Sequence, residues 1–163
     1  MSRWCPAYVG IGSNMGDSRA RVRDAFAALG ALPGTRLMSR SPLYLTAPFG
    51  PVEQGAFVNA VAGLLTQLSV GAFFGALRAA ETALGRRRGQ VRWGPREIDL
   101  DLLVFGELRV AEDELVLPHP GIPERDFVLY PLRDVAPGLI VPGLGLVSEL
   151  AARVLDRGMR LAD

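Results

Sequence analysis

Two carboxylates, Asp99 and Asp101, stand one residue apart in a stretch with the apolar content of a buried strand. Side chains alternate between the faces of a strand, so both carboxylates point the same way, with Cβ atoms roughly 6.5–7 Å apart. Two like charges this close repel each other and lose hydration, so a positive partner must lie nearby. A carboxylate pair without a histidine or cysteine partner suits Mg²⁺, and two such ions ~3.5–4 Å apart can share the pair. The alternative is a purely structural pair that forms ion pairs with arginines.

An arginine-rich stretch immediately precedes the acidic pair. Its five basic residues are Arg86, Arg87, Arg88, Arg92 and Arg96. A guanidinium group forms forked hydrogen bonds to phosphate oxygens, so these side chains next to the acidic strand favour a phosphate-binding loop. Trp93-Gly94-Pro95 forms a rigid corner that can place Arg92 and Arg96 on one side of a pocket. The alternative for this stretch is a solvated charged loop.

The composition excludes several other chemistries. The chain has 163 residues, 49% of them apolar and 21% charged, which suits a single globular domain over 1–163. A chain of this length buries about 70% of its surface on folding. All eighteen basic residues are arginine, so a Walker-A phosphate loop and a Schiff-base lysine are both excluded. The net charge of +1 creates no field that would recruit nucleic acid or an acidic membrane.

The cysteine and histidine content points to the cellular compartment. Cys5 and His119 are the only residues of their types, which excludes an intrachain disulfide and a Cys/His zinc site. This usage is typical of a reducing compartment. The N-terminus lacks a signal-peptide pattern and no apolar run reaches 18 residues, so we expect a cytoplasmic protein.

Hydrophobic periodicity predicts strands interleaved with helices. Strands are expected over 7–12, 36–45, 57–65 and 98–105, and helices over 18–30, 69–85, around 127–132 and over 147–155. We further expect Gly106 to turn the acidic strand toward a partner at 108–110, and Pro131 to interrupt the third helix. Two of the strands are adjacent in sequence, which argues against a strictly parallel sheet. The order favours an α+β sandwich with a largely antiparallel sheet packed by helices.

Several short motifs together resemble one family, the 6-hydroxymethyl-7,8-dihydropterin pyrophosphokinases of folate biosynthesis. They are YVGIGSNMGD, SPLYLTAPFGP, FVNAV, ETALGRRR, RWGPREIDLDLLVFG and LPHPGIPERDFVL, in this order and as far as about Val141. The RWGPR-x-IDLD segment is highly specific. The resemblance implies a ferredoxin-like fold and transfer of the terminal diphosphate of ATP to the pterin hydroxymethyl group, with release of AMP.

The resemblance also implies roles for single residues. Asp99 and Asp101 would bind two Mg²⁺ ions that bridge the ATP phosphates, and Arg86 and Arg96 would contact the phosphates as the transferred group moves. Further residues would line the nucleotide side: Glu81, Arg88, Arg92, Trp93, His119 and Arg125. Others would bind the pterin: Phe57 and Phe127 by stacking, Asn59 at the ring edge, and the backbone around Thr46, Ala47 and Phe49. The stretches 46–56 and 85–95 match the family's two mobile catalytic loops.

Two departures from the family pattern are visible. Phe57 stands where tyrosine is frequent, and Gly89 stands where members of the family carry lysine. From the residues alone, a second function stays open, a non-catalytic ferredoxin-like module that binds RNA or a metabolite through its arginine loop. We expect instead a monomeric enzyme that acts on ATP and the pterin, with no nucleic-acid partner.

Overall fold

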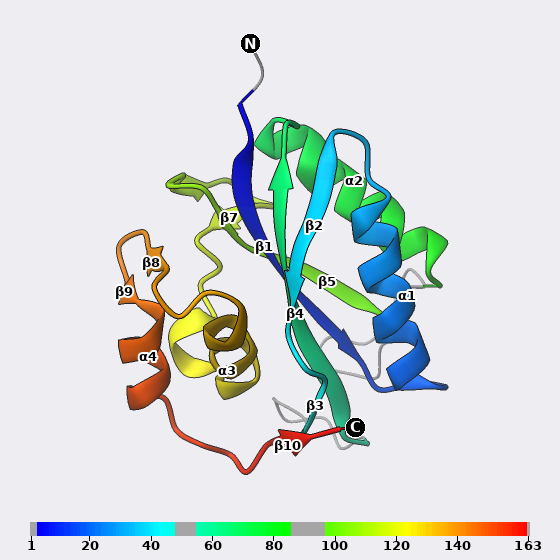
Figure 1. Ribbon diagram of the computed structural model, residues 1–163, viewed down its shortest axis with the longest axis vertical. Helices are drawn as coiled ribbons and strands as arrows, with labels where there is room; N and C mark the ends of the chain where they lie inside the picture. The colour runs from blue at the N-terminus through cyan, green and yellow to red at the C-terminus, as the bar shows by residue number, and fades with distance from the viewer. Residues whose placement is uncertain (1–2, 48–54, 86–96, 163) are drawn as a thin grey trace.

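The computed structural model describes residues 3–47, 55–85 and 97–162, and its centre is an antiparallel sheet (Figure 1). The sheet has the strand order β10-β3-β4-β1-β5, and β2 also pairs with β4. Its strands are β1 (Cys5–Ser13), β2 (Thr35–Arg40), β3 (Tyr44–Thr46), β4 (Phe57–Thr66), β5 (Asp99–Phe105) and β10 (Arg160–Leu161). Strands β1 to β5 and helices α1 and α2 follow each other in the order β-α-β-β-β-α-β. This is the β-α-β-β-α-β order of a ferredoxin-like fold with its second strand divided into β2 and β3, which both pair with β4, and it confirms the predicted class.

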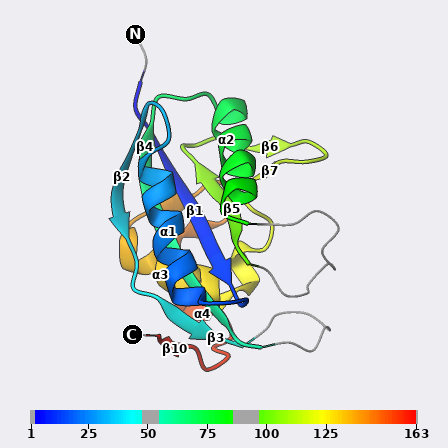
Figure 2. The same cartoon turned by 90° about the vertical axis from the view of Figure 1, so that its right-hand side faces the viewer.

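Helices cover both faces of this sheet. Helices α1 (Ser18–Gly30) and α2 (Val70–Ala83) lie on one side, and α3 (Asp126–Val135) and α4 (Val147–Arg153) on the other (Figures 1 and 2). Each side has its own apolar core. Leu100 and Leu102 of β5 pack with α1 and α2, whereas Leu103 packs with α3 and α4. The strand that carries the two carboxylates is therefore fixed from both sides.

The first two helices begin where the sequence predicts. The Asp17 carboxylate accepts a hydrogen bond from Ala20 N at 3.1 Å, and Ser69 Oγ accepts one from Ala72 N at 3.2 Å. Both are N-cap contacts, which satisfy amides that the first helical turn leaves without partners. The expected apolar face of α1, namely Val22, Ala25, Phe26 and Leu29, is buried.

Two short hairpins and a 3₁₀ turn complete the fold. The hairpins are β6 (Val110–Ala111) with β7 (Val116–Leu117), and β8 (Ile140–Val141) with β9 (Gly145–Leu146). The turn, Ile122–Glu124, precedes α3. Tyr44 of β3 donates a hydrogen bond to Asp134 of α3, and burial together with this carboxylate raises the pKa of Tyr44 to about 12.

Three local predictions are wrong. The single strand expected over 36–45 is two strands, because Pro42 has no N–H for the ladder. The stretch 108–110 does not pair with the acidic strand, since Val110 pairs with Leu117. Pro131 does not interrupt α3. A proline inside a helix costs about 3 kcal/mol, and burial of Val128, Leu129 and Leu132, at roughly 1.5–3 kcal/mol each, outweighs it.

Candidate active site

The acidic pair lies on one face of β5. Asp99 and Asp101 are half-buried, whereas Ile98 and Leu100, which alternate with them, are fully buried on the opposite face. Within the described residues, strand β5 is the last strand at its end of the main sheet, and its ladder neighbour there is β1. The two carboxylates therefore project on the side of α3 and α4, at an edge of the sheet.

Two glycines of β1 lie directly beside these carboxylates. Gly12 pairs with Asp99, and Gly10 pairs with Asp101. Gly12 also pairs with Asn59 of β4 on its other side. Residues directly opposite each other in a sheet point to the same face, so Asn59, Gly12 and Asp99 form one row. Because the central member has no side chain, the Asn59 carboxamide can lie over it.

The amide end of this row is tightly held. Asn59 is 8% exposed, and its Nδ2 donates to Thr46 Oγ1 of β3 at 2.7 Å. Its Oδ1 lies over Gly12, where an added Cβ would approach it to 2.7 Å. Phe57 reaches the same place, since its ring would lie 3.9 Å from that Cβ. The two β4 residues that the sequence assigns to the pterin thus lie together on the face of Asp99.

Helix α3 begins on this same side of the sheet. Phe127, in its first turn, is half-buried and packs against the core beneath α3 and α4. The Arg125 guanidinium carbon lies 5.7 Å from the centre of its ring, which is cation–π distance. A residue predicted for the nucleotide and one predicted for the pterin are therefore neighbours.

His119 is fixed in a defined tautomer. Its backbone N–H donates to Leu103 O of β5 at 2.9 Å, and its Nδ1 accepts from Gly121 N at 3.0 Å. Burial, aided by the positive charge of Arg125, lowers the pKa of His119 to about 4. The ring is therefore neutral at pH 7, with its proton on Nε2, where it can donate a hydrogen bond to an anion.

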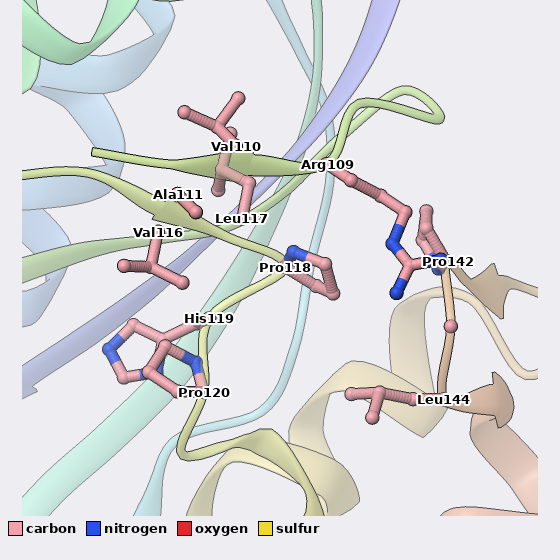
Figure 3. A pocket seen from close by; sticks show the side chains of 11 residues that line it. Arg109, Val110, Ala111, Val116, Leu117, Pro118, His119, Pro120, Pro142 and Leu144 are labelled. Carbon is pink, nitrogen blue, oxygen red and sulfur yellow. The ribbon is translucent and has the colours of Figure 1, made fainter.

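His119 also borders a pocket. A cavity of about 360 Å³ lies between the β6–β7 hairpin and the segment that joins β8 to β9 (Figure 3). Its walls are mostly apolar, with Val116, Leu117 and Leu144 among them, and Arg109 reaches across toward Pro142 and Gly143. The volume lies in the 300–1,000 Å³ range typical of small-molecule sites.

Glu81 is buried, and its carboxylate contacts the acidic strand. It is 3% exposed, and its Oε2 accepts a hydrogen bond from Leu100 N at 2.7 Å. The fully buried residues of α2 are Phe73, Leu77 and Glu81, and Ala80 and Leu84 pack partly buried against the same core. An acid on this face gives no periodic apolar signal, so its burial is explained by its partners, the Leu100 backbone and Arg78.

The structure describes the residues on either side of the arginine-rich stretch, and residues 86–96 lie outside the described ranges. Arg21 of α1 donates to Leu84 O at 3.4 Å and lies 3.8 Å from Glu97 Oε2, and Ser13 Oγ donates to Glu97 O. These contacts hold the end of α2 next to the start of β5. Six predicted site residues lie outside the described residues: Phe49, Arg86, Arg88, Arg92, Trp93 and Arg96. Ala47 is described and exposed, at the end of β3.

Two searches over the described ranges bear on metals and membranes. In residues 3–47, 55–85 and 97–162, no group of three or more His, Cys, Asp or Glu side chains could hold a metal ion. A magnesium site made with a nucleotide needs only one or two carboxylates, because phosphates and water supply the other ligands. The same part of the chain contains no helix that is long and apolar enough to cross a membrane.

Comparisons with known proteins agree with this geometry. The profile of the 7,8-dihydro-6-hydroxymethylpterin-pyrophosphokinase family matches residues 8–137. The chain belongs to this family. Relatives named 2-amino-4-hydroxy-6-hydroxymethyldihydropteridine pyrophosphokinase support the assignment. The protein from Pseudomonas aeruginosa is 46% identical over 145 residues, 89% of each chain. That from Methylorubrum extorquens is 43% identical over 157 residues, 96% of this chain and 98% of the relative.

Solved structures show the same fold in this pyrophosphokinase family. Wild-type HPPK-DHPS from Plasmodium falciparum superposes with a TM-score of 0.74 at 12% sequence identity. The match covers 94% of this chain and 45% of the Plasmodium chain. At this identity the likeness concerns the fold alone.

Three residues of the site region escape prediction from the sequence. Gly12 stands inside a strand, Arg21 faces both ends of the arginine-rich stretch, and Arg78 contacts β5 from α2. A glycine inside a strand does indicate close approach of another group, so Gly12 carried a signal. Arg21 and Arg78 act on backbone atoms of distant residues, and such contacts leave no pattern in the sequence.

Proposed function

We propose that this chain transfers the terminal diphosphate of ATP to the hydroxymethyl group of 6-hydroxymethyl-7,8-dihydropterin and releases AMP, as a step of folate biosynthesis. The row formed by Asn59, Gly12 and Asp99 is the observation that carries the proposal. It brings a ring-edge amide and a carboxylate onto one face of the sheet, two strand spacings or roughly 10 Å apart. A pterin at one end and a nucleotide polyphosphate at the other can therefore meet above Gly12.

Asp99 and Asp101 fit Mg²⁺ bound together with ATP. Both carboxylates are half-exposed on one face of the same strand, so both can reach one metal–nucleotide complex. We propose two ions, held by this pair and by the nucleotide. Bound there, the ions would neutralise charge on the transferred group.

We propose that the pterin is bound by two aromatic rings and one side-chain amide. Asn59 lies below the proposed ring edge with its Nδ2 bonded to Thr46, so Oδ1 is the atom directed toward Gly12. Phe57 and Phe127 would cover the two faces of the ring. The hydroxymethyl oxygen then attacks the β-phosphorus of ATP, the bond from that phosphorus to the bridging oxygen breaks, AMP leaves with the electron pair, and the hydroxyl proton passes to water.

The nucleotide side combines neutral and charged donors. His119 presents Nε2–H and Arg125 a guanidinium group, and we propose that Arg86, Arg88, Arg92 and Arg96 add further charge, with Trp93 beside them. Such a reaction needs positioning and charge stabilisation and no covalent nucleophile. We propose the pocket next to His119 for the nucleoside end of ATP.

The proposal extends to the setting of the reaction. We propose that residues 1–163 form one pterin diphosphokinase domain that acts as a monomer in the cytoplasm. Sedimentation of the purified chain at micromolar concentration tests the monomer, and a dimer would contradict it.

Product analysis tests the activity. Purified protein with ATP, the hydroxymethyl dihydropterin and Mg²⁺ should form AMP and pterin diphosphate in equal amounts. Leaving out the pterin or chelating Mg²⁺ should stop AMP formation. Absence of AMP, together with RNA binding that weakens steeply with salt, would support the RNA-binding alternative instead.

A further inference from the structure

The residue between the two carboxylates has an unusual set of partners. Among the strands that the structure describes, β5 pairs with β1 on one side of the main sheet, so alternate residues turn their backbone groups off the sheet edge. Leu100 is such a residue. Its N–H donates to Glu81 Oε2 at 2.7 Å, and its carbonyl accepts from the Arg78 guanidinium. Two side chains of α2 thus take the place of a neighbouring strand at this one position.

These two side chains also hold each other. Arg78 Nε lies 3.2 Å from Glu81 Oε1, and the Arg78 guanidinium carbon lies 4.9 Å from the centre of the Phe74 ring. Glu81 is 3% exposed, and a buried carboxylate persists only when a charge and hydrogen-bond donors compensate it. Arg78, Glu81 and the Leu100 backbone therefore form a closed polar ring at the sheet edge.

The position of this ring relates it to the acidic pair. The N–H of Leu100 belongs to the peptide plane that joins Asp99 to Leu100, and its carbonyl belongs to the plane that joins Leu100 to Asp101. Glu81 thus fixes the plane next to one carboxylate, and Arg78 fixes the plane next to the other. The Leu100 side chain is fully buried in the core under α1 and α2, which removes the remaining freedom.

We propose that Arg78 and Glu81 are positioning residues of the diphosphoryl transfer. They hold the backbone on both sides of Leu100, so that the Asp99 and Asp101 carboxylates meet the metal–nucleotide complex at a fixed separation. The inference rests on the proposed function. It assigns Glu81 an effect on the nucleotide through β5 rather than through contact with ATP.

The test compares variants of full-length protein. Glu81→Ala removes the acceptor for Leu100 N–H, Glu81→Gln keeps an oxygen acceptor, and Arg78→Met removes the donor to Leu100 O. Thr82→Ser is the matched control, because Thr82 is exposed on the same helix and serine keeps the hydroxyl that donates to Arg78 O. A misplacement near 1 Å costs up to about 100-fold in rate, so Glu81→Ala and Arg78→Met should lower kcat 10- to 100-fold. Glu81→Gln should retain activity within about fivefold.

A second readout separates positioning from loss of folding. Titration calorimetry with Mn²⁺ and a non-hydrolysable ATP analogue should show at least tenfold weaker binding to Glu81→Ala and Arg78→Met. Pterin affinity, which depends on β4, should stay within twofold of wild type, and the far-UV circular dichroism should be unchanged. If Glu81→Ala does not fold, Glu81→Gln and Arg78→Met give the same comparison.

Two outcomes would overturn the inference. One is wild-type kcat and Mn²⁺–nucleotide affinity in folded Arg78→Met and Glu81→Ala. The other is an equal loss of pterin and nucleotide binding, which indicates a general structural role. Either result leaves the proposed function intact while wild type forms AMP. If wild type itself forms no AMP, the proposed function fails.

Discussion

Replacing Gly12 by alanine should weaken pterin binding without unfolding the protein. The new Cβ would lie 2.7 Å from Asn59 Oδ1, so the carboxamide must retreat by about 0.7 Å to reach the 3.4 Å of ordinary contact. Asn59 has little room to do so, since it is 8% exposed and its Nδ2 is bonded to Thr46 at 2.7 Å. The shift therefore displaces the amide that we assign to the ring edge.

The size of the effect follows from one hydrogen bond. A net contribution of about 0.5–1.5 kcal/mol corresponds to a 2- to 13-fold higher Kd for the pterin. The rate should fall further, toward 100-fold, because the hydroxymethyl oxygen moves with the ring.

Pterin fluorescence titration and steady-state kinetics measure the two effects. Gly10→Ala is the comparison variant, because its Cβ meets only the Leu103 side chain, at 3.5 Å, and leaves Asn59 in place. Its pterin Kd should equal that of wild type. An unchanged pterin Kd in folded Gly12→Ala would refute the assignment of Asn59 to the ring edge.

Three further predictions concern the charges of the site. Asp99→Ala and Asp101→Ala should each abolish AMP formation. The free energy of unfolding in urea should be equal to that of wild type or slightly higher, because like-charge repulsion is relieved. If neither variant folds, the two carboxylates are a structural pair. Arg86→Ala and Arg96→Ala should lower kcat far more than they lower ATP affinity. Single-turnover kinetics measures the first effect and calorimetry the second. A loss of ATP affinity alone would contradict the proposed role of these arginines. At pH 7 the His119 ring is mostly neutral in both the folded and the unfolded chain. As the pH falls from 6.5 toward 4, His119 of the unfolded chain binds a proton, whereas His119 of the folded chain, with its pKa of about 4, does not. Relative to His119→Gln, the free energy of unfolding should therefore fall by about 2 kcal/mol between pH 7 and pH 5; equal pH profiles would disprove the lowered pKa.

Periodic and capping signals account for the parts of the fold that the sequence predicts. The buried face of α1 and the N-caps at Asp17 and Ser69 depend on neighbours within four residues, so local sequence patterns can predict them. The division of 36–45 into two strands depends on Pro42, because its lack of an N–H outweighs the apolar pattern on either side of it. Pro131 shows the opposite case, because apolar burial on α3 outweighs a local rule.

The site divides in a similar way. The shared face of Asp99 and Asp101 follows from strand alternation alone, and the structure has it. The place of Asn59 beside them depends on β4 and β1 pairing in one register out of many, which no local pattern specifies. The contacts of Glu81 and Arg78 with Leu100 depend on how α2 lies against the sheet edge, so they became visible only in three dimensions.

The spacing of hydrogen-bonded strands limits which acceptors can react. Asn59 and Asp99 lie on two strands that both pair with β1, which runs between them. The distance between the two residues is therefore fixed by the spacing of hydrogen-bonded strands. In a pterin with a hydroxyethyl group in place of the hydroxymethyl group, the side chain is one carbon–carbon bond, or about 1.5 Å, longer. Its hydroxyl oxygen would then be displaced by about that distance from the position that the hydroxymethyl oxygen takes next to the phosphorus. Selectivity for the length of the pterin side chain would then come from backbone geometry, and side-chain substitutions in the ring pocket alone would not relax it.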